Sequence, residues 1–345
     1  MVTRTDVAKR AGVSVATVSN VFNNNVFVLP ETERKVRKAA SELGYTPNFT
    51  ARSLSLGHSY QIGIAISECT NPYHMEFFQA ISDYAAENGF MAVLFPMYRG
   101  AENSFEMLRQ RQFDALVNLS SQVYPSELVD ILKRKDTIMV NCSNDGLYFS
   151  ADLAPSMLEA MELLRTNGHR KVAYISTVDK IRWQSDQRGK IFTENKSRFG
   201  FDTDERLCEF NDNCFAPSEK AGYDVTNKLL MRGVKFTALF AMNDLAAIGA
   251  IRALGEAGLS VPDDVSVIGC DGIDIAEYTT PRLTSIAFDK AEMGRKIAEK
   301  VIEYITDNKK PHGETFITKT YLKTGNSVAR VKPEAETSPL IAEAG

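Results

Sequence analysis

Cysteine is scarce in this chain of 345 residues and follows no pattern that would pair it. The five cysteines are odd in number, far apart and without CxxC spacing: Cys69, Cys142, Cys208, Cys214 and Cys270. A disulfide framework is therefore not indicated, and a reducing cytoplasm is the expected compartment. No apolar run approaches the roughly 18 residues that span a membrane, and the N-terminus, MVTRTDVAKR, is charged where a signal peptide is apolar. We expect neither export nor membrane insertion.

Motifs of the common enzyme classes are also lacking. The sequence has no GxSxG, no P-loop lysine and no HExxH, and its four histidines (His58, His74, His169 and His312) show no metal-ligand spacing. The glycines of GAIRALGEAG lie in a helical pattern rather than in a dinucleotide-binding loop. We therefore expect no catalytic residues, no metal ion and no cofactor.

The charge of the chain is unevenly distributed, although its composition, 44% hydrophobic and 24% charged residues, is ordinary for a globular protein. Residues 1–58 contain eight basic and four acidic residues, a net charge of +4. The remainder contains 32 basic and 40 acidic residues, a net charge of −8. A basic head on an acidic body favours a polyanion as the partner of the head.

Three short helices are predicted in the basic head. An apolar pattern over residues 5–11 is interrupted by Gly12, after which Ser14 can cap a second helix. A third helix begins after Pro30 and ends at Gly44. Two short helices joined by a tight turn, with a third packed across them, form a helix-turn-helix unit.

The head also resembles a known family. The run TRTDVAKRAGVSVATVSNVFNN over residues 3–24, followed by YTPNFTARSLSLG over residues 45–57, closely resembles the DNA-binding head and hinge of the LacI/GalR family of bacterial repressors. The similarity extends through nearly the whole chain. It implies a helix-turn-helix domain over residues 1–46, a hinge helix and linker over 47–59, and an effector-binding and dimerisation domain over 60–330.

In that family the start of the second helix reads bases, which places Val15, Ala16 and Asn20 at the major groove. Small apolar side chains suit thymine methyl groups, and asparagine can pair with adenine. Many relatives have arginine where Asn20 stands. Other polar residues of the head are candidate ligands of DNA phosphates, which position the protein on the duplex but carry no sequence information. The alternative is that they only cap helices at the surface. These ligands are Thr5, Ser14, Thr17, Ser19, Asn23 and Tyr45.

The predicted hinge follows the head. Pro47 cannot continue the third helix, and residues 50–56 suffice for only two helical turns, too few to be stable alone. The resemblance implies that this helix pairs with its twin in a second subunit and inserts Leu54 into the minor groove, with Arg52 as a further DNA contact. Docking of Leu54 on the body is the alternative.

From residue 61 onward, apolar strands alternate with amphipathic helices. The strand runs QIGIAIS, FMAVLF, DALVNLS and TIMVN form one series, and KVAYIS, TALFAM and VSVIGC belong to a second. Such strands are typical of parallel sheets covered on both faces. The predicted fold class is therefore an all-α helix-turn-helix head plus an α/β body of two doubly wound parallel-sheet subdomains, as in periplasmic sugar-binding proteins. The pattern also predicts one helix near 185–198 and one last strand near 314–323.

The resemblance suggests how the body divides. A first subdomain is expected over about 60–151 plus 290–312, and a second over about 152–288 plus 313–330. Residues 331–345 lack leucine heptads and are expected to form a flexible tail, so a coiled-coil tetramer is not expected.

Ligands of doubly wound folds bind beyond the carboxyl ends of the strands. The resemblance places an effector site in those loops, where His74 replaces the phenylalanine of many relatives. An arginine, a carboxylate and an amide beside an aromatic ring suit a polyhydroxylated ligand. For some candidate ligands a structural role is the alternative. Trp183 would then belong to the core, and Asn243 or Asp244 would only cap a helix. The candidate effector ligands are Tyr73, His74, Trp183, Arg188, Phe215, Asn243 and Asp271.

The sequence thus predicts a homodimeric transcriptional regulator, a repressor, that binds a pseudo-palindromic operator and responds to a sugar or phosphorylated sugar. One small head makes few base contacts, whereas two heads on a twofold axis read two half-sites. A sugar-binding module of a transport system would have an export signal and no such head. A body that senses a partner protein, or an anionic metabolite through Arg182 and Arg188, remains open.

We predict that Leu54→Ala weakens specific operator binding and leaves salt-dependent nonspecific binding nearly unchanged. Inserting an apolar wedge costs a few kcal/mol of base stacking, which the bent DNA offsets by contacting more protein. Titrations of operator and scrambled duplexes at one salt concentration measure both affinities. An equal loss on both duplexes contradicts the wedge.

Overall fold

The computed structural model describes residues 2–23, 27–46, 57–97, 101–120, 123–213 and 216–332. The predicted contacts Arg52, Leu54 and Phe215 lie outside these residues. The chain divides into two compact units, a head of residues 1–60 and a body of residues 61–345, and each is described by itself.

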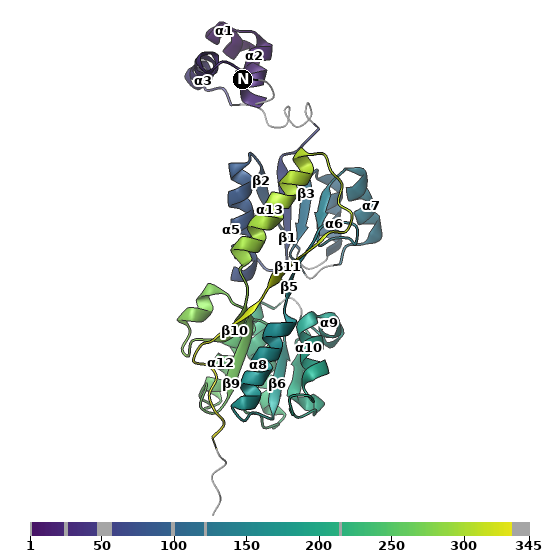
Figure 1. The fold of residues 1–345 in the computed structure, drawn as a ribbon, viewed down its shortest axis with the longest axis vertical. Coiled ribbons are helices and arrows are strands. Elements are labelled where there is room, and N and C mark those ends of the chain that lie inside the picture. Colours follow the sequence, from purple (N-terminus) through teal and green to yellow (C-terminus); the bar gives the residue numbers. More distant parts are fainter. Residues whose placement is uncertain are drawn as a thin grey trace, which may run out of the picture. The chain divides into compact units, whose positions relative to one another are not determined.

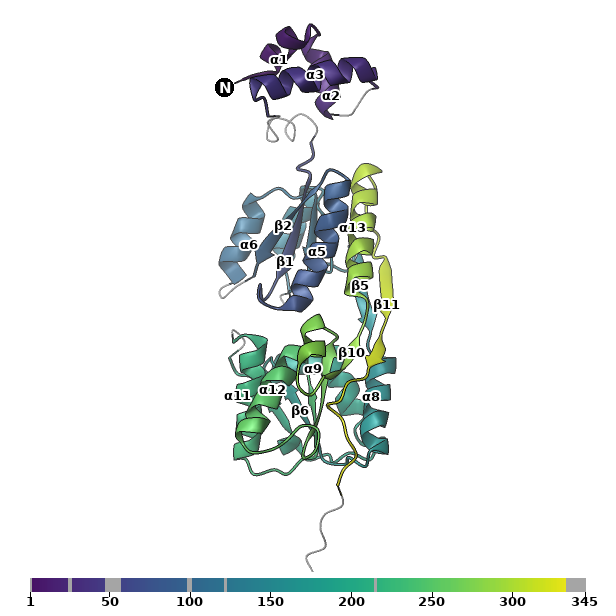
Figure 2. The ribbon, with the colours of Figure 1, turned by 90° about the vertical axis from the view of Figure 1, so that its left-hand side faces the viewer.

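The described head residues form the three expected helices: α1 (Arg4–Ala11), α2 (Val15–Asn23) and α3 (Pro30–Leu43) (Figure 2). Thr3 is the N-cap of α1, because its hydroxyl accepts from the backbone N–H of Asp6 while the Asp6 carboxylate accepts from the backbone N–H of Thr3. Apolar residues at spacings of three and four on each helix meet in one core. This core consists of Val7, Ala8, Val18, Val21, Val36, Ala39 and Ala40.

The first half of the body, the N-lobe, is built on a parallel sheet with the strand order β2-β1-β3-β4 in the described residues. Its strands are β1 (Gln61–Ile66), β2 (Met91–Pro96), β3 (Ala115–Asn118) and β4 (Ile138–Val140). Its helices are α5 (Pro72–Glu87), α6 (Ala101–Gln110), α7 (Ser126–Arg134) and α13 (Lys290–Thr306). Helices α5 and α13 lie side by side on one face, and α6 lies on the other (Figures 1 and 2).

The second half, the C-lobe, contains a sheet with the order β12-β10-β9-β8-β6-β7, in which β12 alone is antiparallel to its neighbour among the described strands. Its strands are β6 (Val172–Ser176), β7 (Cys208–Phe210), β8 (Ala238–Ala241), β9 (Ser266–Asp271), β10 (Thr284–Ala287) and β12 (Tyr321–Lys323). Its helices are α8 (Ala154–Thr166), α9 (Lys180–Ser185), α10 (Gln187–Asn195), α11 (Ser218–Met231), α12 (Asp244–Glu256), and the 3₁₀ helices η1 (Glu205–Leu207) and η2 (Asp274–Tyr278).

A parallel pair of strands joins the two lobes: β5 (Tyr148–Asp152) and β11 (Thr315–Lys319) (Figure 1). The prediction of one last strand near 314–323 is wrong at Thr320, where β11 ends before β12 begins in a different sheet. The Thr320 hydroxyl lies 2.6 Å from the Asp152 carbonyl oxygen and 2.8 Å from Ser156 Oγ. These long-range contacts hold the break between the two strands.

The helix predicted near 185–198 is confirmed as α10, and a separate short helix, α9, precedes it. The two are separated at Asp186, whose backbone is extended. The Asp186 carboxylate accepts from the backbone N–H of Arg188 at 2.9 Å and so caps α10. A helix start at Asp186 brings this carboxylate and the Arg188 guanidinium together.

Helices α11 and α12 pack backbone against backbone through two glycines. A Cβ atom at Gly222 would collide with the Ala246 backbone, and one at Gly249 with the Glu219 carbonyl oxygen. Neither backbone can move away without displacing its helix. The close approach requires glycine at both positions.

We predict that Gly249→Ala lowers the free energy of unfolding of the body by about 2 kcal/mol or more, because the added methyl group overpacks this contact. Gly255→Ala is the matched control in the same helix, since a Cβ atom there meets nothing within 4 Å. It should raise stability by roughly 0.5–1 kcal/mol through helix propensity. Urea unfolding of the full chain measures both changes, and equal effects would contradict the packing.

Candidate DNA-binding surface and ligand cleft

The start of α2 presents the predicted base-reading residues to solvent. Val15 is 44% exposed, Ala16 is also exposed, and Asn20 is half-buried. Val18 and Val21 turn into the head core and hold this face outward. The exposed pair has the size and polarity that a thymine methyl group requires.

The candidate phosphate ligands differ in the contacts that their side chains make within the head. Ser14 is a cap, because its hydroxyl accepts from the backbone N–H of Thr17 at 3.0 Å and lies 2.9 Å from Thr17 Oγ1. Thr5 is exposed. Asn23 lies in α2, and its side chain is outside the description. The hydroxyls of Ser19 and Tyr45 meet a third residue, Arg4, which the sequence analysis did not identify.

In the body, a cleft of about 1040 Å³ lies between the lobes at the carboxyl ends of their strands. Residues of the loops after β1, β6, β8 and β9 line it. Five of the seven predicted effector ligands are among the lining residues: Tyr73, His74, Arg188, Asn243 and Asp271.

Arg188 is the centre of the polar side of the cleft. Its Nε and Nη2 atoms donate to the two oxygens of Asp186 at 3.0 and 2.9 Å, and Nη1 donates to the Met242 carbonyl oxygen at 2.9 Å. The guanidinium also lies 3.6 Å from Asp271 Oδ1. Burial alone would raise the pKa of Asp186, but the charge and hydrogen bonds of Arg188 bring it below the usual value.

Asp271 ends β9 in an unusual environment. Burial raises its pKa to about 8, although the nearby Arg188 charge opposes the rise. Its φ angle of +121° lies in a region that L-residues rarely adopt, and such strain persists where the surroundings enforce it. Here the ammonium group of Lys290 donates to the Asp271 carbonyl oxygen at 2.7 Å and pairs with Glu76 at 3.1 Å.

Aromatic rings also line the cleft. The Tyr73 ring lies 5.2 Å from Phe77, 5.3 Å from His74 and 6.3 Å from Phe288, each near edge-to-face. Burial lowers the pKa of His74 to about 4, so the imidazole is neutral near pH 7. Its buried Nδ1 has no hydrogen-bond partner among the described residues. A bound ligand can supply that partner.

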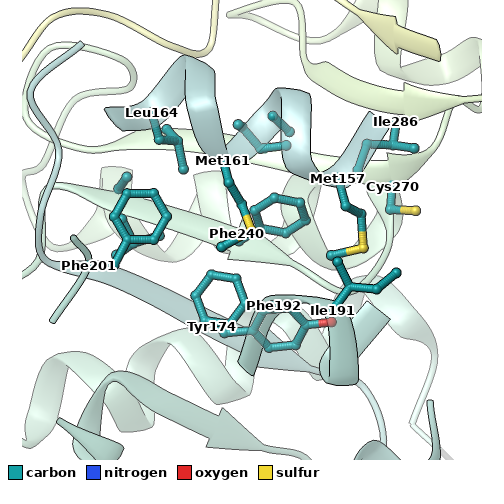
Figure 3. Close-up of a cluster of buried hydrophobic side chains, with 14 of the residues drawn as sticks. Met157, Met161, Leu164, Tyr174, Ile191, Phe192, Phe201, Phe240, Cys270 and Ile286 are labelled. Carbon is teal, nitrogen blue, oxygen red and sulfur yellow. The ribbon is translucent and has the colours of Figure 1, made fainter. Parts of the chain in front are cut away.

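Trp183, predicted to stack on the effector, lies in the core instead of the cleft. Trp183 is 8% exposed, packs 4.8 Å from the Phe210 ring and 5.8 Å from the Tyr174 ring, and is absent from the cleft lining. It belongs to the C-lobe core, where Tyr174, Phe192 and Phe240 gather beneath α8 (Figure 3). A lone tryptophan of this size is buried here for its apolar area.

Asn243 and Asp244 have different roles. Asn243 caps α12 by accepting from the backbone N–H of Ala246 at 2.8 Å, and it also lines the cleft. Asp244 is fully buried and accepts from the Ser285 hydroxyl and the Ile273 backbone N–H. Burial raises the pKa of Asp244 to about 6. Asp244 thus supports the loop after Asp271 rather than the ligand.

Glu68 connects the lobes across the cleft, a role with no local sequence signal. Helix α11 has no side-chain cap from its own N-cap residue, Pro217. The Glu68 carboxylate, from the loop after β1, instead accepts from the Ser218 backbone N–H at 3.1 Å and from its hydroxyl at 2.9 Å. An N-lobe carboxylate therefore caps a C-lobe helix, which favours the closed arrangement of the lobes.

The described residues contain neither a metal centre nor a membrane span. No group of three or more histidine, cysteine, aspartate or glutamate side chains is placed to hold a metal ion there. No helix in the same ranges is long and apolar enough to cross a membrane.

A basic helix-turn-helix head and a two-lobed body with a polar interlobe cleft define a ligand-binding DNA-binding regulator. The family model for bacterial regulatory proteins of the lacI family matches residues 3–48, and the periplasmic binding protein-like domain matches residues 161–328. The HTH-type transcriptional repressor PurR of Histophilus somni is 31% identical over 325 residues, 90% of this chain and 95% of the relative. Its counterpart in Pectobacterium carotovorum is 32% identical over 320 residues, 90% of this chain and 92% of that protein. The chain belongs to the LacI family.

Solved structures agree with this assignment. The lac repressor dimer bound to operator and the anti-inducer ONPF is 24% identical with a TM-score of 0.75, over 95% of this chain and 99% of that chain. A complex of the transcriptional regulator CelR with cellobiose is 26% identical with a TM-score of 0.67, over 95% of this chain and 100% of that chain. The predicted fold class is confirmed, and the relatives are transcriptional repressors, so the chain is a DNA-binding regulator and not an enzyme.

We predict that Asp271→Asn weakens the pH dependence of stability between pH 4 and 8. The folded protein retains a proton on Asp271 up to its pKa of about 8, whereas the unfolded chain releases it near the ordinary value of 3.8. Stability therefore falls as the pH rises through this window, and asparagine removes that contribution. The raised pKa of Asp244 contributes to the slope with the same sign, and this contribution remains in the variant. Urea unfolding at pH 5, 6.5 and 8 measures the slope.

The matched control is Asp136→Asn, because the Asp136 side chain is 73% exposed. It should leave the slope as in the unchanged protein. A slope for Asp271→Asn equal to that of the control contradicts the burial of the Asp271 carboxyl.

Proposed function

We propose that this chain is a cytoplasmic, homodimeric repressor that binds a pseudo-palindromic operator and is controlled by a sugar or a sugar derivative. The observation that carries the proposal is the polar network of Arg188, Asp186 and Asp271, which lines the interlobe cleft together with aromatic rings. The predicted head, hinge and body, over residues 1–46, 47–59 and 60–330, then have separate tasks in one mechanism.

Base reading is assigned to the exposed start of α2. Val15 and Ala16 contact thymine methyl groups, and Asn20 pairs with adenine. These few contacts are too weak alone, so two heads on a twofold axis read two half-sites. Arg52 and Leu54 of the paired hinge contact the centre of the site. Support comes from a relative solved as a lac repressor dimer bound to operator.

The effector is assigned to the cleft by the balance of its groups. A sugar hydroxyl both donates and accepts, and each hydroxyl needs a partner once it leaves water. Arg188 donates, the Asp186 carboxylate accepts, and the protonated Asp271 carboxyl can donate as well as accept. The neutral His74 ring has a buried Nδ1 with no partner among the described residues. The ring of Tyr73 covers the apolar face of the ligand. Related structures are described with bound cellobiose, ribose and lactose.

A phosphorylated sugar is the second candidate, because Arg182 also lines the cleft. The Arg182 side chain is 45% exposed and lies 3.6 Å from the Asp179 carboxylate. An anionic group at the mouth of the cleft would meet this guanidinium, while the ring of the sugar would meet Arg188.

Closure of the lobes couples the two sites. The Glu68 cap on α11 exists only when the lobes are close together. A ligand that bridges the cleft binds this closed state more tightly than an open one, and it shifts the equilibrium by that difference in affinity. The changed N-lobe surface then alters the pairing of the hinge helices.

The DNA-binding part is tested by selecting bound sites from a random DNA pool with the full-length protein at stated salt. We expect a twofold-symmetric site with a central step that is easily kinked. Selection is repeated with pooled sugars, because a corepressor-dependent protein binds only then. Failure to enrich a symmetric site under both conditions refutes the proposal.

The effector part is tested by calorimetry with neutral sugars, sugar phosphates and nucleobases. We expect binding of a neutral or phosphorylated sugar that Arg188→Met weakens at least ten-fold. Arg206→Met is the matched control, since Arg206 is 71% exposed and lies outside the cleft lining. Binding of a nucleobase but of no sugar would refute the sugar assignment and keep the cleft as the site.

A further inference from the structure

Arg4 occupies an unexpected position in the head. It is the first residue of α1, the end of a helix where the macrodipole disfavours a cation. Its Nη1 atom donates to Ser19 Oγ at 2.7 Å, and its Nε atom donates to the Tyr45 hydroxyl at 3.3 Å. Arg4 is thus half-buried between the first turn of α1, helix α2 and Tyr45, which follows the Gly44 cap of α3.

The charge of Arg4 is not neutralised within the head. Three cations of the head do have acidic partners: Arg10 pairs with Glu42 at 2.7 Å, Lys35 with Glu31 at 2.9 Å, and Arg37 with Glu33 at 2.7 Å. No carboxylate pairs with Arg4 in the described residues, where both of its partners are neutral hydroxyls. A fixed cation with neutral partners creates a positive potential at this point of the surface.

The two hydroxyls gain donor capacity from this arrangement. Each accepts a hydrogen bond from Arg4, so each still has its own proton to donate. The Arg4 guanidinium has five N–H groups, of which these contacts use two. Arg4, Ser19 and Tyr45 together therefore offer several donors and one net positive charge. That set suits a phosphate oxygen and disfavours a cation.

We infer that Arg4, Ser19 and Tyr45 form one phosphate-binding site for the DNA backbone, with Arg4 as its charged member. The inference rests on the proposed DNA-binding role of the head and adds a residue to it. The Phe22 ring lies 5.6 Å from the Tyr45 ring and holds that phenol against the core. The site fixes the position of α2 in the groove, because phosphate contacts set register.

The test compares Arg4→Met with the unchanged full-length protein on the selected site and on a 30-base-pair duplex of scrambled sequence. The logarithm of the affinity is measured against the logarithm of the salt concentration. One phosphate contact per head contributes about 0.9 to the slope, so a dimer should lose about 2 on the selected site. We also expect at least a ten-fold weaker affinity near physiological salt. Arg4→Lys, which keeps the charge, should restore most of the slope.

Arg37→Met is the matched control. It removes the same charge from the exposed face of α3, where Glu33 already neutralises it, and it should leave the slope nearly unchanged. Ser19→Ala and Tyr45→Phe should each cost less affinity in the Arg4→Met background than alone, because the three residues hold one phosphate.

Each outcome decides the inference. An unchanged slope, or an equal loss in Arg37→Met, overturns it. A weaker affinity with the slope retained, together with a lower melting temperature of the head, shows that Arg4 only supports the fold, and this also overturns it. If the unchanged protein selects no site at all, the proposed function fails instead. The scrambled duplex still measures the contribution of Arg4 to backbone binding in that case.

Discussion

The buried charge of Arg188 is the constraint around which the body is arranged. Its side chain is only 20% exposed, and a buried guanidinium is tolerated only when its donors have partners. Asp186 supplies two of these partners and can do so because the chain breaks between α9 and α10. The Met242 carbonyl oxygen supplies the third from the end of β8. Asp271, at the end of β9, lies 3.6 Å from the same guanidinium. Three separate segments of the C-lobe thus meet at one cation on the polar side of the cleft.

Closure of the cleft depends on contacts between the lobes. Lys290, at the start of α13, binds the carbonyl oxygens of Asp271 and Gly272 and pairs with Glu76 of α5, so one buried ammonium joins both lobes. Glu68 adds a cap on α11 from across the cleft. These polar contacts break when the lobes move apart, so they contribute to the balance between the closed and open states. A ligand held by Arg188 and Tyr73 adds its own bridge and shifts that balance.

Much of this organisation is predictable from the sequence, because helix caps, apolar spacing and strand patterns are local signals. The three head helices and the parallel strands follow from them, and the five lining residues of the cleft follow from the family resemblance. The end of β11 at Thr320 follows from neither, since it depends on contacts with residues distant in sequence. Trp183 was ambiguous because an aromatic residue suits both a core and a ligand site. Arg4, Glu68 and Lys290 act through long-range contacts that no local pattern records.

The central claim is that one ligand in the cleft and one DNA site at the head share a coupling free energy. Thermodynamic linkage requires that the ligand change the operator affinity by the same factor by which the operator changes the ligand affinity. The direct measurement is therefore both titrations on one protein: operator with and without saturating sugar, and sugar with and without saturating operator. The account predicts that the operator affinity and the sugar affinity change by the same factor, about five or more, and in the same direction. A ligand that binds the cleft with a factor of one in both titrations would contradict it.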